Sequence, residues 1–138
     1  MDLTELDTSS AADEGVEMAV RHPVTNAPLM MADGETPITI RVAGMDSKIF
    51  RKAQRANQDR RMKGARYRAP TADELDAEAT ELVAKCTLSW RGVMIDGAEL
   101  QCSFANAKQL YTRLPWLREQ VDLFMGDRAN FLQTPATS

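Results

Sequence analysis

The sequence predicts an α+β fold, in which a small N-terminal antiparallel β-sheet is followed by a helical bundle of three to four helices. Apolar and polar residues alternate before residue 44, and apolar residues recur at helical spacing after Thr71. Turn-forming residues separate the two patterns. A chain of 138 residues can bury one modest core. We therefore expect a single domain over residues 15–132, with the sheet in 15–44 and the helical part in 45–132.

The N-terminal section predicts an arm followed by two strands. Residues 1–14 are rich in Asp, Glu, Ser and Thr and have few apolar anchors, so we expect a disordered acidic arm. Two runs then alternate between apolar and polar residues, as half-buried strands do. Their apolar positions are Val16, Met18 and Val20 in the first run and Ile38, Ile40 and Val42 in the second. Three prolines and an Asp-Gly pair lie between these runs, and we expect two or three antiparallel strands over about 16–43.

A basic helix is expected next. Asp46 or Ser47 can cap it, and it should run to about Met62 or Gly64. Its apolar side is thin and consists of Ile49, Phe50, Ala53 and Ala56. Little beyond Asn57 can be buried, so residues up to Arg68 should form a solvated helix end or a linker.

Three further helices are expected in the second half. Thr71 and Glu74 have the spacing of a capping box, and we expect this helix to continue past Trp90 and stop at Gly92. The next helix has Ser103 as its cap, after an Asp96-Gly97 turn. We expect its apolar stripe to be Phe104, Ala107, Leu110 and Tyr111. The last helix should have Pro115 in its first turn and end at Gly126, with Phe131 and Leu132 folding back onto it and residues 133–138 forming a frayed tail.

The formal charge is unevenly distributed along the chain. Residues 1–47 carry −7, residues 48–68 carry +8 and residues 69–138 carry −4. The basic segment could attract an acidic partner, including the acidic arm of this chain or of another copy. Only Phe50 and Tyr67 could stack on bases, and the flanking sequence is acidic, so we do not expect nucleic acid to be the partner.

Two groups of residues are candidates for partner binding. The basic helix is one, and the other is the stretch between the two tryptophans. We expect the aromatic residues to be mostly core, with one edge of Trp90 or Trp116 left for a partner. An apolar run beside the Asp-Gly turn falls in a predicted loop, where it would form a small exposed patch. The candidate residues are Lys48, Arg51, Lys52, Arg55, Trp90, Val93, Met94, Ile95 and Trp116.

The sequence gives little support for catalysis. His22 is the only histidine and lies beside Pro23 in a turn region, where we expect an ordinary surface side chain. Cys86 and Cys102 are too few for a disulfide framework or a zinc site, and we expect buried thiols. There is no phosphate loop, no export signal and no apolar run of about 20 residues. We therefore expect no catalytic residue, cofactor or metal ligand, no enzyme activity and no membrane partner.

A series of short motifs runs from about Leu82 to Phe131. The motifs are Trp90-Arg91-Gly92-Val93, Asp96-Gly97, Ser103 with Asn106, Leu110-Tyr111, Leu114-Pro115-Trp116, Glu119-Gln120-Val121 and Asp127-Arg128-Ala129-Asn130-Phe131. The front half has a strand region, Gly44, Asp46-Ser47 and a basic helix. In these motifs and this layout the chain resembles tail assembly chaperones of long-tailed bacteriophages.

This resemblance implies a binding protein of the host cytoplasm. Its expected partner is the tape measure protein, which such chaperones keep soluble while the tail tube polymerises, and the tail tube protein is a second expected partner. Self-association is a further expectation. The alternative is a structural tail or head-completion protein of the virion, and the third reading is a nucleic-acid-binding regulator.

Overall fold

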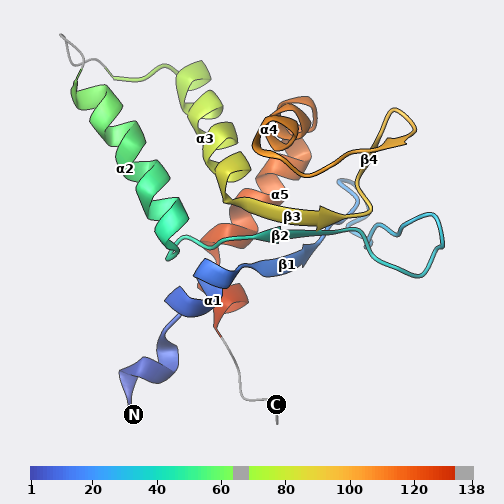
Figure 1. Ribbon diagram of the computed structural model, residues 1–138, viewed down its shortest axis with the longest axis horizontal. Coiled ribbons are helices and arrows are strands. Elements are labelled where there is room, and N and C mark those ends of the chain that lie inside the picture. Colours follow the sequence, from blue (N-terminus) through green and yellow to red (C-terminus); the bar gives the residue numbers. More distant parts are fainter. Residues whose placement is uncertain (64–68, 133–138) are drawn as a thin grey trace.

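A computed structural model describes residues 1–63 and 69–132, and it confirms the α+β class (Figure 1). A three-stranded antiparallel sheet has the order β1-β2-β3, with β1 at Val16–Ala19, β2 at Thr39–Val42 and β3 at Thr87–Arg91. The first two strands lie where the alternation predicted them. Two helices, α2 at Lys48–Met62 and α3 at Ala72–Cys86, rise side by side from one end of this sheet (Figure 1).

One row of side chains across the sheet connects it to the core. Ile40 of the central strand pairs with Met18 on one side and with Trp90 on the other. Ile40 and Met18 are buried, and Trp90 packs against the same core cluster. The register shifts between Arg41 and Val42, and Val42 pairs with Thr87. The apolar face predicted from alternation is therefore the face that the helices cover.

The third strand corrects the predicted helix boundary. We expected the helix from Thr71 to continue past Trp90, but α3 ends at Cys86 and β3 begins at Thr87. The amide of Ala43 donates to the carbonyl oxygen of Cys86 at 2.9 Å, so the sheet begins where the helix stops. Residues 87–91 also alternate in character, and the unpaired edge of β2 stabilises them as a strand. The sheet thus takes its third strand from outside the expected segment 15–44. Gly92 has a left-handed backbone, with φ of +82°, but it follows β3 and does not end a helix.

A buried hydroxyl pair fixes the junction between α3 and β3. Tyr111 lies in α4 (Phe104–Arg113) and is fully buried. Thr87 donates from Oγ1 to the carbonyl oxygen of Val83 at 2.9 Å, so the Tyr111 hydroxyl donates to Thr87 at 2.7 Å. Burial raises the pKa of Tyr111. The phenol therefore remains a donor at any ordinary pH.

The predicted helix starts are confirmed, because each depends on a local hydrogen bond. The side chain of each cap accepts a hydrogen bond from a backbone amide three residues later. The pairs are Ser47 with Phe50, Thr71 with Glu74, and Ser103 with Asn106. Helix α5 runs over Pro115–Gly126, with the proline at its start and the glycine at its end, as expected.

The N-terminal section is more ordered than expected. A 3-10 turn, η1, covers Leu3–Leu6, and helix α1 covers Ser9–Glu14. The expectation of a disordered arm is wrong for α1, because Ala11 and Ala12 are buried and the carbonyl oxygen of Ala12 accepts from the amide of Gly44 at 3.1 Å. Two small apolar residues are enough to anchor one helical turn. The 3-10 turn itself buries no residue.

Asp46 joins the N-terminal, central and C-terminal parts of the chain. Its carboxylate accepts from Nε and a terminal nitrogen of Arg128 at 2.8 and 3.0 Å, from Thr8 Oγ1, and from Arg51 at 3.3 Å. The side chain is only 11% exposed. Arg128 begins the 3-10 turn η2 (Arg128–Phe131). These contacts hold α1, α2 and η2 around one carboxylate.

The C-terminal turn folds back onto α5, as expected. Phe131 is buried, and its ring meets that of Phe124 edge-on with centroids 5.7 Å apart. A Cβ on Gly44 would lie 3.0 Å from the Phe131 ring, so glycine lets the ring pack on the backbone. Leu132 is partly buried. The expected frayed tail at 133–138 and the linker at 64–68 lie outside the described residues.

We predict that Asp46→Asn lowers the free energy of unfolding by about 1.5–3 kcal/mol, the contribution of hydrogen bonds to a charged group. The hydrogen bonds from Arg128 and Thr8 hold the pKa of Asp46 well below its usual range. The stabilisation should therefore be complete above about pH 5 and decrease as the pH falls below about 4 toward the folded-state pKa. Urea unfolding of both proteins between pH 2 and pH 7 measures the difference.

Asp122→Asn is the matched control, because Asp122 is exposed on α5. Its unfolding free energy should stay within about 0.5 kcal/mol of the parent. A difference between parent and Asp46→Asn that does not decrease with acid would contradict the assigned role of the carboxylate.

Candidate partner-binding surface

Helix α2 leaves most of its surface uncovered. Of its 15 residues only Ala53 is buried. It packs along α3 on one side, and it is the outermost helix of the molecule in Figure 1. A helix with such a thin packed side gains little stability from tertiary contacts. The rest of its surface is therefore available for binding.

An apolar groove lies where α2, α3 and α4 meet. Its volume is about 400 Å³. Small residues of the two long helices line it, together with Ile49 and Phe104, and Phe104 is 45% exposed despite its size. The lining residues are Ile49, Lys52, Ala53, Ala56, Ala84, Lys85, Thr87 and Phe104. We call this feature the α2–α4 groove.

Two lysines stand beside the apolar lining of this groove. Lys52 comes from α2 and Lys85 from α3. Lys85 lies 3.5 Å from Glu81, one turn earlier on its own helix. Both side chains are partly exposed, and such a pair is weak, so Lys85 can exchange Glu81 for another carboxylate. The groove therefore combines apolar lining with positive charge.

A basic ridge continues from the groove along α2. The predicted residues Lys48, Arg51, Lys52 and Arg55 are all exposed and surround one hollow together with Ala56 and Asp59. Lys52 and Ala56 belong to both features, so the ridge and the groove form one surface. Arg51 is paired with Asp46, whereas Lys48, Lys52 and Arg55 have no ion pair within the described ranges 1–63 and 69–132. The structure thus brings the four predicted basic residues together.

The apolar run at Val93 is not the exposed loop that we expected. Met94–Ile95 and Ala98–Glu99 form strands β4 and β5 of a hairpin. Asp96 and Gly97 both have positive φ, at +52° and +81°, as a two-residue hairpin turn requires. Val93 is 7% exposed and belongs to the core, whereas Met94 is 56% exposed. Only Met94 stands clear of the molecule, and Ile95 is half-buried.

The two tryptophans are half-buried and pack against the core. Trp90 donates from Nε1 to the carbonyl oxygen of Leu100 at 2.7 Å, which connects β3 to the chain after the hairpin. Arg113 pairs with Asp96 through two contacts of 2.9 Å. The hairpin and α2 lie at opposite ends of the molecule in Figure 1. The predicted residues therefore belong to two separate surfaces, and the one on α2 adjoins the α2–α4 groove.

Sequence reasoning assigned Phe104 to the buried stripe of its helix. The structure places the other three members of that stripe in the core and leaves Phe104 in the groove. Its position directly after the Ser103 cap was the available signal, because a first-turn residue can lie off the packed stripe. Nothing in the sequence pattern predicted that Ala84 and Lys85 would line a groove.

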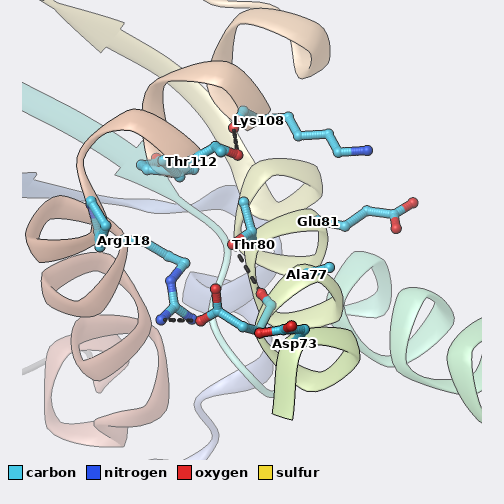
Figure 2. Close-up of a pocket in the computed structure, with 10 residues that line it drawn as sticks. Asp73, Ala77, Thr80, Glu81, Lys108, Thr112 and Arg118 are labelled. Carbon is cyan, nitrogen blue, oxygen red and sulfur yellow. Dashed lines mark hydrogen bonds and ion pairs between the residues drawn. The ribbon is translucent and has the colours of Figure 1, made fainter. Parts of the chain in front are cut away.

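A second pocket, of about 340 Å³, lies between α3 and the α4–α5 pair (Figure 2). Charged and hydroxyl side chains are among its lining residues, and Arg118 lies 3.0 Å from Asp76. The hydroxyl groups of Thr80 and Thr112 donate to carbonyl oxygens of their own helices. Because these hydroxyl groups are bound to the backbone, they are not positioned as nucleophiles. We interpret this pocket as a joint between helices.

His22 and Cys86 are respectively hydrogen-bonded and buried, and Cys102 is partly exposed. His22 accepts at Nδ1 from the amides of Val24 and Thr25, so it caps a turn. Burial raises the pKa of the Cys86 thiol to about 12 and also raises that of Cys102. Among the described residues, no group of three or more His, Cys, Asp or Glu side chains could hold a metal ion.

Within the described part of the chain, none of the helices has the length and apolar character needed to cross a membrane. Comparisons of the chain with protein-family models, with curated proteins and with solved structures gave no match. The α2–α4 groove and the motifs of the sequence are therefore the features that bear on function.

We predict that Val93→Ser lowers the free energy of unfolding by about 1.5–3 kcal/mol, because it removes a buried Val side chain. Met94→Ser should change it by no more than about 0.5 kcal/mol, because Met94 is exposed. Chemical denaturation of the two variants measures both values. Equal losses of unfolding free energy in the two variants would contradict the burial of Val93 and the exposure of Met94.

We also predict that Cys86 is protected from a thiol reagent at pH 8 in the folded protein and reacts once the protein unfolds. The raised pKa leaves little thiolate, and burial blocks access. Mass spectrometry after iodoacetamide treatment, with and without urea, identifies the labelled residue. Rapid labelling of Cys86 without urea would contradict the prediction. Cys102 is partly exposed and should react first.

Proposed function

We propose that this protein is a tail assembly chaperone of a long-tailed phage, which binds the tape measure protein in the host cytoplasm and keeps it soluble while the tail tube polymerises. The observation that carries the proposal is the α2–α4 groove, with its apolar lining, two lysines and adjoining basic ridge. The resemblance of the motifs between Leu82 and Phe131 supplies the identity of the client.

The groove suits an amphipathic helix as its occupant. Helices of this kind bind by placing an apolar stripe in a groove and their polar residues at its edges. Ile49 and Phe104 offer apolar contact, and Lys52 offers a partner for a carboxylate on the client. A long helical client with exposed apolar stripes would otherwise associate with itself.

The charge of the ridge supports a reversible interaction. Lys48, Lys52 and Arg55 are exposed, and exposed charges favour encounter more than they hold a complex. A small apolar groove adds limited affinity. A chaperone must release its client to the tube subunits, and moderate affinity allows that release.

We predict that Ala56→Glu impairs client binding without unfolding the protein. Ala56 is exposed on α2 and lines both the groove and the ridge. Glutamate is a good helix former, but it introduces bulk and negative charge there. In co-expression with a tape measure protein, the variant should bind at least about tenfold more weakly than the parent and give less soluble client.

Gln58→Glu is the matched control, because it makes the same change of charge on α2 and lies outside the groove and the ridge. It should retain client binding. If the parent, Ala56→Glu and Gln58→Glu all keep the same amount of client soluble, the proposal is contradicted. Recovery of the chain from purified particles would favour the structural alternative, and DNA binding that survives about 200 mM salt would favour the regulator.

A further inference from the structure

The 3-10 turn at Leu3–Leu6 has two exposed leucines. Leu3 is 75% exposed and Leu6 is 48% exposed. Residues at positions i and i+3 of a 3-10 turn lie on the same side, so the two side chains form one apolar strip. Asp2, Glu5 and Asp7 lie beside them. The segment therefore combines an apolar strip with acidic side chains beside it, as a ligand for an apolar and basic groove would.

This segment is held in shape before any partner binds. The carboxylate of Asp2 accepts from the amide of Thr4 at 3.0 Å, and that of Asp7 accepts from the amide of Ser9 at 2.9 Å. Thr8 is bound to Asp46, which fixes the base of the arm to the domain. A preformed segment loses less conformational entropy on binding than a flexible one.

We propose that residues 1–7 of one copy of this chain dock in the α2–α4 groove of a second copy. Leu3 and Leu6 would contact the lining formed by Ile49, Ala56 and Phe104. The acidic side chains would lie against Lys52 and the basic ridge. The inference does not require the proposed client, because it concerns this chain alone.

Charge complementarity selects this occupant. The arm carries three carboxylates in its first seven residues, and the ridge carries three basic side chains without an ion pair among the described residues. The arm also supplies the apolar strip that an apolar groove needs. In Figure 1 the turn projects to the far side of the sheet from the paired helices α2 and α3. A second copy brings the two surfaces together without bending the arm.

The association should be weak and sensitive to salt. One short segment buries less surface than the roughly 1,200 Å² of a standard interface. We expect a dissociation constant between about 1 µM and 1 mM. Raising the salt concentration should weaken binding, because the contributing charges are exposed.

Sedimentation equilibrium of the full chain at several concentrations up to about 1 mM tests the proposal. The parent should self-associate, and the double variant Leu3→Ser, Leu6→Ser should associate at least about tenfold more weakly. Ala56→Glu should weaken it as well. Leu123→Ser, which alters an exposed leucine on α5, should have no effect. A parent that stays monomeric, or variants that associate like the parent, would overturn the proposal.

Cross-linking identifies the occupant of the groove. In a Cys102→Ser background, one chain carries Leu6→Cys and a second, longer tagged chain carries Ala56→Cys. A short bis-maleimide reagent should join the two chains when they are mixed. The same pair of cysteines placed in a single chain should also give dimers at high concentration. Linkage only within single chains would assign the groove to the chain's own arm and overturn the proposal. If client binding fails while self-association persists, only the proposed function is lost.

Discussion

The direct passage from helix to strand at Cys86 and Thr87 determines how the two halves of the protein meet. Thr87 caps α3 and pairs with Val42 in the sheet. Its hydroxyl oxygen also accepts a hydrogen bond from the buried hydroxyl of Tyr111. With no connecting loop, α3 has a fixed direction relative to the sheet, and α4 is bound to the same point. Helix α2 then packs mainly along α3, which leaves most of its surface exposed. The groove is thus a consequence of this junction.

Local interactions made much of the fold predictable. The caps at Ser47, Thr71 and Ser103 and the turn at Asp96 and Gly97 each depend on residues within a few positions of one another. Strand β3 was not predictable in the same way, because residues 87–91 fit a helix or a strand and the choice depends on pairing with a strand almost 50 residues earlier. The basic side of α2 was predictable from composition. The groove was not, since it requires Phe104 and Ala84 to be placed beside α2.

Charged side chains in this protein have two different roles. Asp46 is largely buried, and it directs the guanidinium groups of Arg51 and Arg128 to one point. On the opposite end of the molecule, Arg113 holds the hairpin through Asp96. In these pairs, opposite charges neutralise each other where two segments of the chain meet. The side chains of Lys48, Lys52 and Arg55 form no such pair among the described residues, so the ridge keeps its positive potential.

The ring of Phe131 on Gly44, and the guanidinium of Arg128 on Asp46, also set an order of events during translation. The two members of the ion pair are 82 residues apart. At synthesis rates of about 5–20 residues per second, Asp46 leaves the peptidyl transferase centre about 4–16 s before Arg128 is added. During that interval the sheet, α1 and the start of α2 can form, but the surface around Gly44 stays uncovered. The nascent domain therefore closes only when its last turn emerges from the ribosome.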